Sequence, residues 1–163
     1  MNDSMKPVKL GLALVMLSLF FGIGMGVSFG VAEESYKSYV ADNVAKYPEL
    51  HDEKSTAKIW RYAQRAHFHA TGIAAFSLGL LLLTMFSSMA DAFKALVSVS
   101  IGLGGFYPLS WYSMFYLAPI IGRDAAHGHL LTESFTYLGV AGLLVGMVIL
   151  SLNLFLGLFK SAS

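Results

Sequence analysis

Leu10 to Ala32 reads LGLALVMLSLFFGIGMGVSFGVA, an apolar run that contains no charged residue. An α-helix needs about 20 apolar residues to cross the hydrocarbon core of a bilayer. Three further runs reach this length: Ala70 to Ala90, Ala95 to Gly122, and Leu130 to Phe159, which only Glu133 interrupts. The chain therefore predicts an all-α integral membrane protein in which four transmembrane helices form one bundle.

The composition supports this class and limits the chemistry of any site. Of the 163 residues, 56% are hydrophobic and 13% are charged, about half the charged fraction of a typical soluble domain. The net charge of +1 gives no reason to expect a nucleic-acid partner. The chain has no cysteine, which excludes disulfides, thiolate ligands and iron–sulfur clusters. A metal would have to be held by His, carboxylate, Met or backbone oxygen.

We expect a single membrane domain over residues 1–163, with helices at about 10–32, 66–89, 95–120 and 126–159. The polar segment 33–65 is expected outside the membrane, as a loop that leads into a helical extension of the second helix. The first run is too long for the apolar part of a typical signal peptide, so it is expected to be retained. Four crossings place both termini on one side, and Asp124 is expected to cap the fourth helix.

The tetrapeptide Ala-His-X-His occurs twice, as Ala66 to His69 and as Ala126 to His129, each time where a polar segment enters an apolar run. Imidazole is costly to bury without a partner, and it readily binds transition metals and haem iron. The two motifs therefore predict a site at one membrane face. A weak similarity between the segments that follow them also suggests two repeated helical hairpins.

Helical geometry limits how these histidines can combine. Residues two apart on a helix point about 200° away from each other, so His67 and His69 cannot bind one ion. The same holds for His127 and His129 unless the helix is unwound there. We therefore expect one histidine from each helix in a site. His129 and Glu133 are four residues apart and share a face, which favours the pair that includes His129.

Two kinds of cofactor fit this pattern, and the sequence leaves the choice open. In the first, one histidine of each motif binds a b-type haem axially, and Arg65 and Arg123 pair with its propionates. Glu133 then handles protons or supports a ligand, and the protein is a cytochrome b-like electron carrier or a subunit of a membrane redox complex. In the second, the four histidines and Glu133 bind copper, iron or zinc for metal handling or metal-dependent oxidation.

A third hypothesis is a cofactor-free structural subunit of a membrane complex, and the sequence does not decide whether the protein is an enzyme. The partners expected are the lipid bilayer and either other membrane subunits or further copies of the chain. His51, beside two acidic residues, is expected to be exposed. The segment Gly128 to Leu131 resembles part of the histidine-bearing helices of haem–copper oxidases and nitric oxide reductases. Those families have many more helices and further histidines, so no function is inferred from this resemblance.

The charges that flank the first helix indicate an orientation. Lys6 and Lys9 precede the helix, and Glu33 and Glu34 follow it. Lysine before the first helix favours a cytoplasmic N-terminus, although the total number of Lys and Arg residues is larger on the histidine side. We expect a bacterial inner-membrane protein with both termini in the cytoplasm and the histidines on the outer side.

Overall fold

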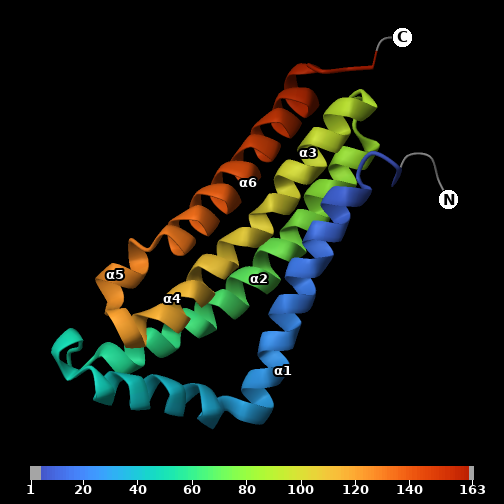
Figure 1. Ribbon diagram of the computed structural model, residues 1–163. Helices are drawn as coiled ribbons and strands as arrows, with labels where there is room; N and C mark the ends of the chain where they lie inside the picture. Colours follow the sequence, from blue (N-terminus) through green and yellow to red (C-terminus); the bar gives the residue numbers. More distant parts are fainter. Residues whose placement is uncertain (1–4, 162–163) are drawn as a thin grey trace.

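The computed structural model describes residues 5–161, and the regular elements within them are helices. Four crossings are long and apolar enough to span a membrane: α1 (Lys9–Lys46), α2 (Ser55–Phe86), α3 with α4 (Asp91–Leu103 and Tyr107–Ile121) and α6 (Leu130–Leu156). The shorter elements are η2 (Pro48–Leu50), η3 (Gly104–Phe106) and α5 (Arg123–His127). This confirms the predicted all-α bundle of an integral membrane protein, and Figure 1 shows the start of α1 and the end of α6 at the same end of the bundle.

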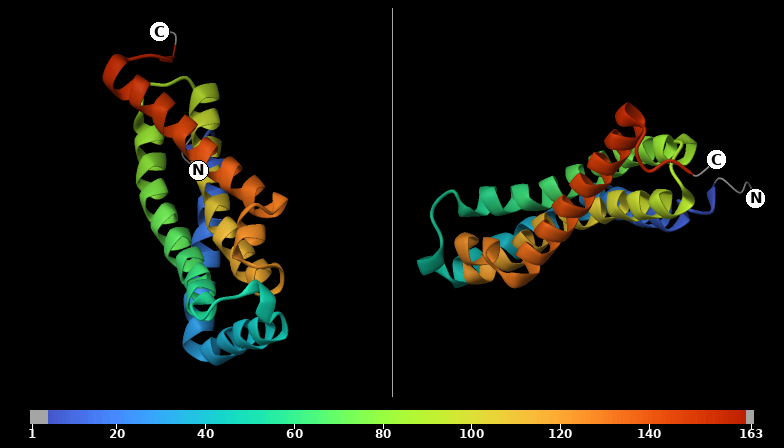
Figure 2. Two further views of the ribbon diagram at one scale, coloured as in Figure 1. Left: turned by 90° about the vertical axis from the view of Figure 1, so that its left-hand side faces the viewer. Right: turned by 90° about the horizontal axis from the view of Figure 1, so that it is seen from above.

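The third crossing lies at the centre of the bundle. Its first half, α3, contacts α1, α2 and α6, and its second half, α4, contacts α2 and α6. The helix α2 and the segment from α5 to α6 carry the two histidine motifs, and they lie on either side of this central crossing (Figures 1 and 2). A site that joins the two motifs must therefore involve α4.

The helix α1 bends sharply at Ala32, which has the non-helical angles φ −141° and ψ 25°. One turn earlier, the Ser28 hydroxyl donates to the Met25 carbonyl at 2.8 Å, a side-chain bond that tends to bend helices. Since this bond uses the only hydroxyl proton of Ser28, the Tyr36 hydroxyl at 2.9 Å must donate to Ser28 Oγ. The Ser28–Tyr36 bond thus links the two arms of α1 across the bend.

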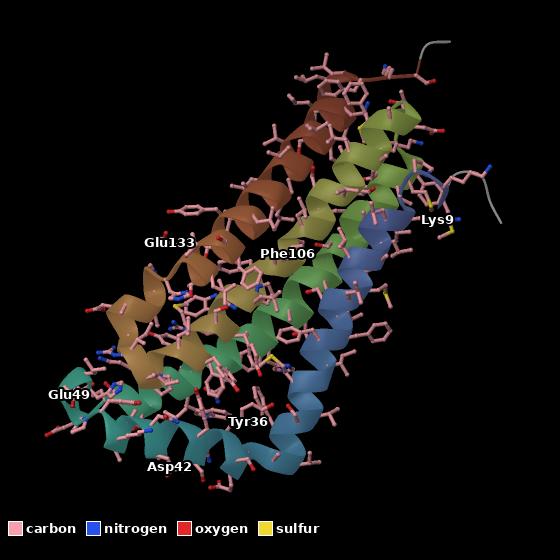
Figure 3. All side chains as sticks on the ribbon, viewed as in Figure 1. Lys9, Tyr36, Asp42, Glu49, Phe106 and Glu133 are labelled. Atoms are coloured by element: carbon pink, nitrogen blue, oxygen red, sulfur yellow. The ribbon has the colours of Figure 1, made fainter. Side chains whose placement is uncertain are left out.

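After the bend, residues 33–46 continue as a helix across the histidine end of the bundle, where the sequence predicted a loop (Figure 1). The residue Val40 is fully buried, and Tyr36 packs against Phe115 of α4 with ring centroids 5.8 Å apart. Figure 3 shows Tyr36 on the inner side of this arm and Asp42 on the outer side. The segment is therefore an amphipathic helix whose apolar side closes one end of the bundle.

Two prolines shape the central crossing. The turn η3 separates α3 from α4 directly before Pro108, which has no N–H to continue the helical hydrogen bonds. Near the other end, α4 stops two residues after Pro119, and Gly122 takes a φ of +81°. Glycine adopts this angle without strain, so the chain can turn into α5.

Glycines in α6 allow it to approach the central crossing closely. A Cβ atom on Gly139 would lie 2.8 Å from Tyr107 Cβ and 2.9 Å from Tyr107 Cα. A Cβ atom on Gly146 would lie 3.0 Å from the Ile101 backbone nitrogen. Membrane helices associate largely through such close backbone packing, so these two glycines set the distance between α6 and the helices it covers.

Candidate functional site

His67 lies between α1 and α2. Its Nδ1 atom is 2.7 Å from the Gly22 carbonyl oxygen, which can only accept, so Nδ1 carries the proton. The ring fits because α1 has a glycine beside it: a Cβ atom on Gly26 would lie 2.8 Å from His67 Cε1. His67 thus joins α1 to α2 and does not share a neighbour with the histidines of the second motif.

His69, two residues further, turns toward α4. Its Nδ1 atom donates to the Arg65 carbonyl at 2.8 Å, so in the neutral ring the proton is on Nδ1 and the lone pair is on Nε2. The ring stacks on Trp111, with centroids 5.8 Å apart and planes at 27°, and it meets Tyr107 edge-on at 5.2 Å. A backbone carbonyl that holds the other ring nitrogen is the usual support of a histidine that binds metal through Nε2.

Trp111 lies at the centre of a cluster of side chains formed by Tyr62, Arg65, His69 and Tyr107. The Arg65 guanidinium lies over its ring at 4.7 Å, and Tyr62 packs against it with centroids 5.8 Å apart. The indole Nε1 is buried, and no hydrogen-bond partner for it lies within residues 5–161. Because a buried N–H without an acceptor is costly, this atom is a candidate donor to a bound molecule.

A cavity of about 140 Å³ lies between α4 and the segment α5–α6. Its walls include Tyr107 and Trp111 from α4, His127 from α5, and Thr132 and Glu133 from α6. The residue Thr132 is only 2% exposed, and its hydroxyl oxygen has no hydrogen-bond partner in the described part of the chain. The cavity therefore joins an imidazole, a carboxylate and two residues with unsatisfied polar atoms.

The second motif is broken at Gly128, so the expected continuous helix is not observed. The helix α5 ends at His127, and His129 is the N-cap of α6: its Nδ1 accepts from the Leu131 backbone N–H at 3.2 Å. This bond places the remaining ring proton of neutral His129 on Nε2. The residue that shares the cavity wall with Glu133 is His127, not His129.

The structure therefore brings together one histidine from each motif. His69 stacks on Trp111, and His127 lies in the wall of the cavity that Trp111 also lines. His127 is exposed, and neither of its ring nitrogens makes a hydrogen bond to another described residue. Within residues 5–161 no group of three or more His, Asp or Glu side chains is arranged to hold a metal ion.

The cationic residues named from the sequence have different positions. Arg65 lies over Trp111, at the candidate site. Arg123 forms an ion pair with Asp52, with Nη2 and Oδ2 3.1 Å apart. This pair ties the loop after η2 to the start of α5. The Arg123 guanidinium is therefore bound to Asp52 and does not lie at the candidate site.

The expectation that His51 is simply exposed was wrong. Its Nε2 atom donates to the Pro119 carbonyl at 3.0 Å, and its side chain is half-buried. Pro119 lies in the last turn of α4, where carbonyls lack partners within the helix. His51 therefore holds the loop that covers the end of α4, a role that a motif search could not reveal because its partner is distant in sequence.

The loop depends on the charge of Asp52. A hydrogen bond from Ser55 Oγ, together with the nearby Lys58 and Arg123 cations, holds the pKa of this carboxyl below its ordinary value. A carboxylate with a lowered pKa stabilises the folded state above its unfolded pKa, and this contribution disappears as the pH falls through the folded pKa.

We therefore expect Asp52→Asn to lower the melting temperature at neutral pH by about 1 to 2 °C, because exposed ion pairs contribute little. The difference from the wild type should disappear once the pH is below the folded pKa of Asp52. Thermal scans over a pH series test this, with Asp42→Asn as the matched control on the outer side of α1. A difference that persists unchanged in acid would contradict the electrostatic explanation.

Trp111, Tyr107 and Thr132 are the site residues that the motif analysis missed. Tyr107 and Trp111 are four residues apart, so they lie on one face of α4, and this spacing in an aromatic-rich run was the available signal. Thr132 carried no such signal. Its importance comes from its burial in the wall of the cavity.

Several glycines of the first three crossings allow close packing between helices. Gly22 and Gly26 lie against α2, and Gly102 and Gly105 lie against α1. The exception near the site is Gly72, where a Cβ atom would meet nothing within 4 Å. Open space is therefore present on α2 one turn beyond His69.

Comparisons with known protein families, with curated proteins and with solved structures found no match to this chain.

Proposed function

We propose that this protein is a small membrane electron-transfer protein, or a subunit of a membrane redox complex, that binds a b-type haem through His69 and His127. The observation that carries the proposal is the bond from His69 Nδ1 to the Arg65 carbonyl, beside the ring of Trp111. It leaves Nε2 with a lone pair and sets the ring orientation, as axial histidines require. His127, without a competing hydrogen bond, would supply the second imidazole.

The surrounding residues fit the other requirements of a haem. Arg65 lies beside His69 on Trp111 and would pair with a propionate. Open space at Gly72 would admit the edge of the macrocycle. The cavity of about 140 Å³ is smaller than a haem, so the macrocycle would also occupy space beyond it, and the Trp111 ring would have to shift.

When bound, the haem would supply reversible one-electron transfer. Thr132 and Trp111 would offer hydrogen-bond donors to it or to a bound water, and Glu133 would exchange a proton at the cavity wall. The alternative with bare copper, iron or zinc has less support, because the described residues contain no assembled group of three metal-binding side chains. We also propose that the protein lies in a bacterial inner membrane with both termini in the cytoplasm, because Lys6 and Lys9 precede α1.

The decisive experiment is the optical spectrum of the detergent-purified protein from cells supplied with a haem precursor and trace metals, combined with elemental analysis. We expect a reduced-minus-oxidised α band of low-spin haem b, with one iron per chain. A colourless preparation with stoichiometric copper, iron or zinc would support the bare-metal alternative and reject haem. A colourless preparation without metal would reject both and leave the structural subunit.

A further inference from the structure

A second polar cavity lies at the opposite end of the bundle, where α2 and α6 end. Its volume is about 500 Å³, and its walls include Ser87 and Ser88 after α2 and Asn153, Gly157 and Lys160 at the end of α6. The helices α2 and α6 both point their C-termini toward this level. Helix C-termini carry partial negative charge, so this end of the cavity favours a cationic or N–H-bearing group.

Asn153 adds an acceptor without a partner. It is only 3% exposed, and its Nδ2 atom donates to the Leu158 carbonyl and, at 3.4 Å, to Ser88 Oγ. Since a carbonyl oxygen can only accept, the side-chain amide cannot be turned around. Its Oδ1 atom is therefore left buried without a hydrogen bond in the described part of the chain. This atom, too, needs an N–H or O–H donor.

Lys160 and Ser88 provide hydrogen-bond donors in the same cavity, and these suit an anion. The Lys160 side chain folds back over the end of α6, so that Cε and Nζ lie 2.9 Å from the position a Cβ on Gly157 would take. No carboxylate pairs with Lys160 among residues 5–161. Ser88 Oγ accepts from Asn153, which leaves its own proton free to donate. An ammonium and a hydroxyl together suit a phosphate.

The rim of the cavity is strongly apolar. Phe86 is 78% exposed and Phe155 is 83% exposed, and both line the cavity. Exposed aromatic side chains at the ends of membrane-spanning helices suit contact with the acyl chains of a lipid. The cavity thus has an apolar rim. Lys160 and Ser88 supply donors for a phosphate, and Asn153 Oδ1 and the end of α6 supply acceptors for an N–H group.

We propose that this cavity binds the headgroup of a phospholipid with a primary ammonium, of the phosphatidylethanolamine class. Lys160 and Ser88 hold the phosphate. The ammonium donates to the C-terminal end of α6 and to the Asn153 Oδ1 atom in the cavity wall. The acyl chains pack on Phe86 and Phe155. This site is independent of the histidine end of the bundle and does not require the haem.

The test measures lipid binding to the full chain in detergent by native mass spectrometry, with phosphatidylethanolamine, phosphatidylcholine and phosphatidylglycerol as probes. We expect phosphatidylethanolamine to bind roughly tenfold more tightly than phosphatidylcholine, which has the same charges but no N–H donors. Lys160→Gln and Ser88→Ala should each reduce this binding several-fold. Asn153 is left unchanged, because it also holds the Leu158 carbonyl.

Lys9→Gln is the matched control, since Lys9 lies at the same end of the bundle but does not line the cavity (Figure 3). It should leave the lipid preference unchanged. Equal binding of the three lipids, or phosphatidylethanolamine binding that Lys160→Gln does not weaken, would overturn the proposal. Tighter binding of phosphatidylglycerol would also overturn it and would indicate a simple anion site. None of these outcomes depends on haem content.

Discussion

His69→Ala is expected to abolish haem binding, with a fall in haem content of at least roughly tenfold. His69 is the histidine of α2 that meets Trp111, and its tautomer leaves Nε2 free for iron. His127→Ala should have a comparable effect, and because His127 is exposed its loss should disturb the fold little. Haem per chain in purified protein measures both effects, with circular dichroism and gel filtration as checks on folding.

The other two motif histidines provide the controls. His129→Ser should keep the haem, because serine can also cap the start of α6. His67→Ala should keep it as well but lower the melting temperature, because the hydrogen bond that joins α2 to α1 at Gly22 is lost. If haem content is unchanged in either His69→Ala or His127→Ala, or falls in His129→Ser, the ligand assignment is wrong.

Gly139→Ala is expected to destabilise the bundle by about 1 to 3 kcal/mol, the usual range for forcing extra volume into a packed core. The atoms that a new Cβ would meet are the backbone nitrogen, Cα and Cβ of Tyr107. Backbone atoms cannot turn away as a side-chain tip can, so α6 must move outward. Thermal unfolding followed by intrinsic tryptophan fluorescence in detergent measures the loss.

Gly79→Ala is the matched control for this prediction. Gly79 is also inside a membrane-spanning helix, but a Cβ atom there would meet nothing within 4 Å. The change should be neutral or stabilise α2 by up to about 1 kcal/mol, because alanine favours helix more than glycine does. Equal melting temperatures for the two variants would show that α6 does not rest on α4 at Gly139.

The motifs supply four candidate histidines, and the fold separates them into different surroundings. Helical geometry predicted that His67 and His69 could not serve one site, and the structure gives them different neighbours, Gly22 and Trp111. The same geometry favoured His129 with Glu133 by assuming one continuous helix. The break at Gly128 made His129 a cap and placed His127 beside the cavity instead.

The loop between α1 and α2 shows why other assignments could not come from sequence. Arg123 was a candidate for haem propionates, yet it pairs with Asp52. His51 was expected to be exposed, yet it donates to Pro119. Each of these contacts joins residues far apart in the chain, and neither leaves a local pattern of spacing.

The membrane class and the four crossings follow from the sequence alone, because the length of an apolar run is a local property. Packing of the helices places α4 between the two histidine motifs and brings Trp111 both to His69 and to the cavity that His127 lines. Apolar helices of similar composition can pack in several orders with similar burial. The order observed here depends on which glycines allow backbones to meet, and those contacts exist only once the helices are assembled.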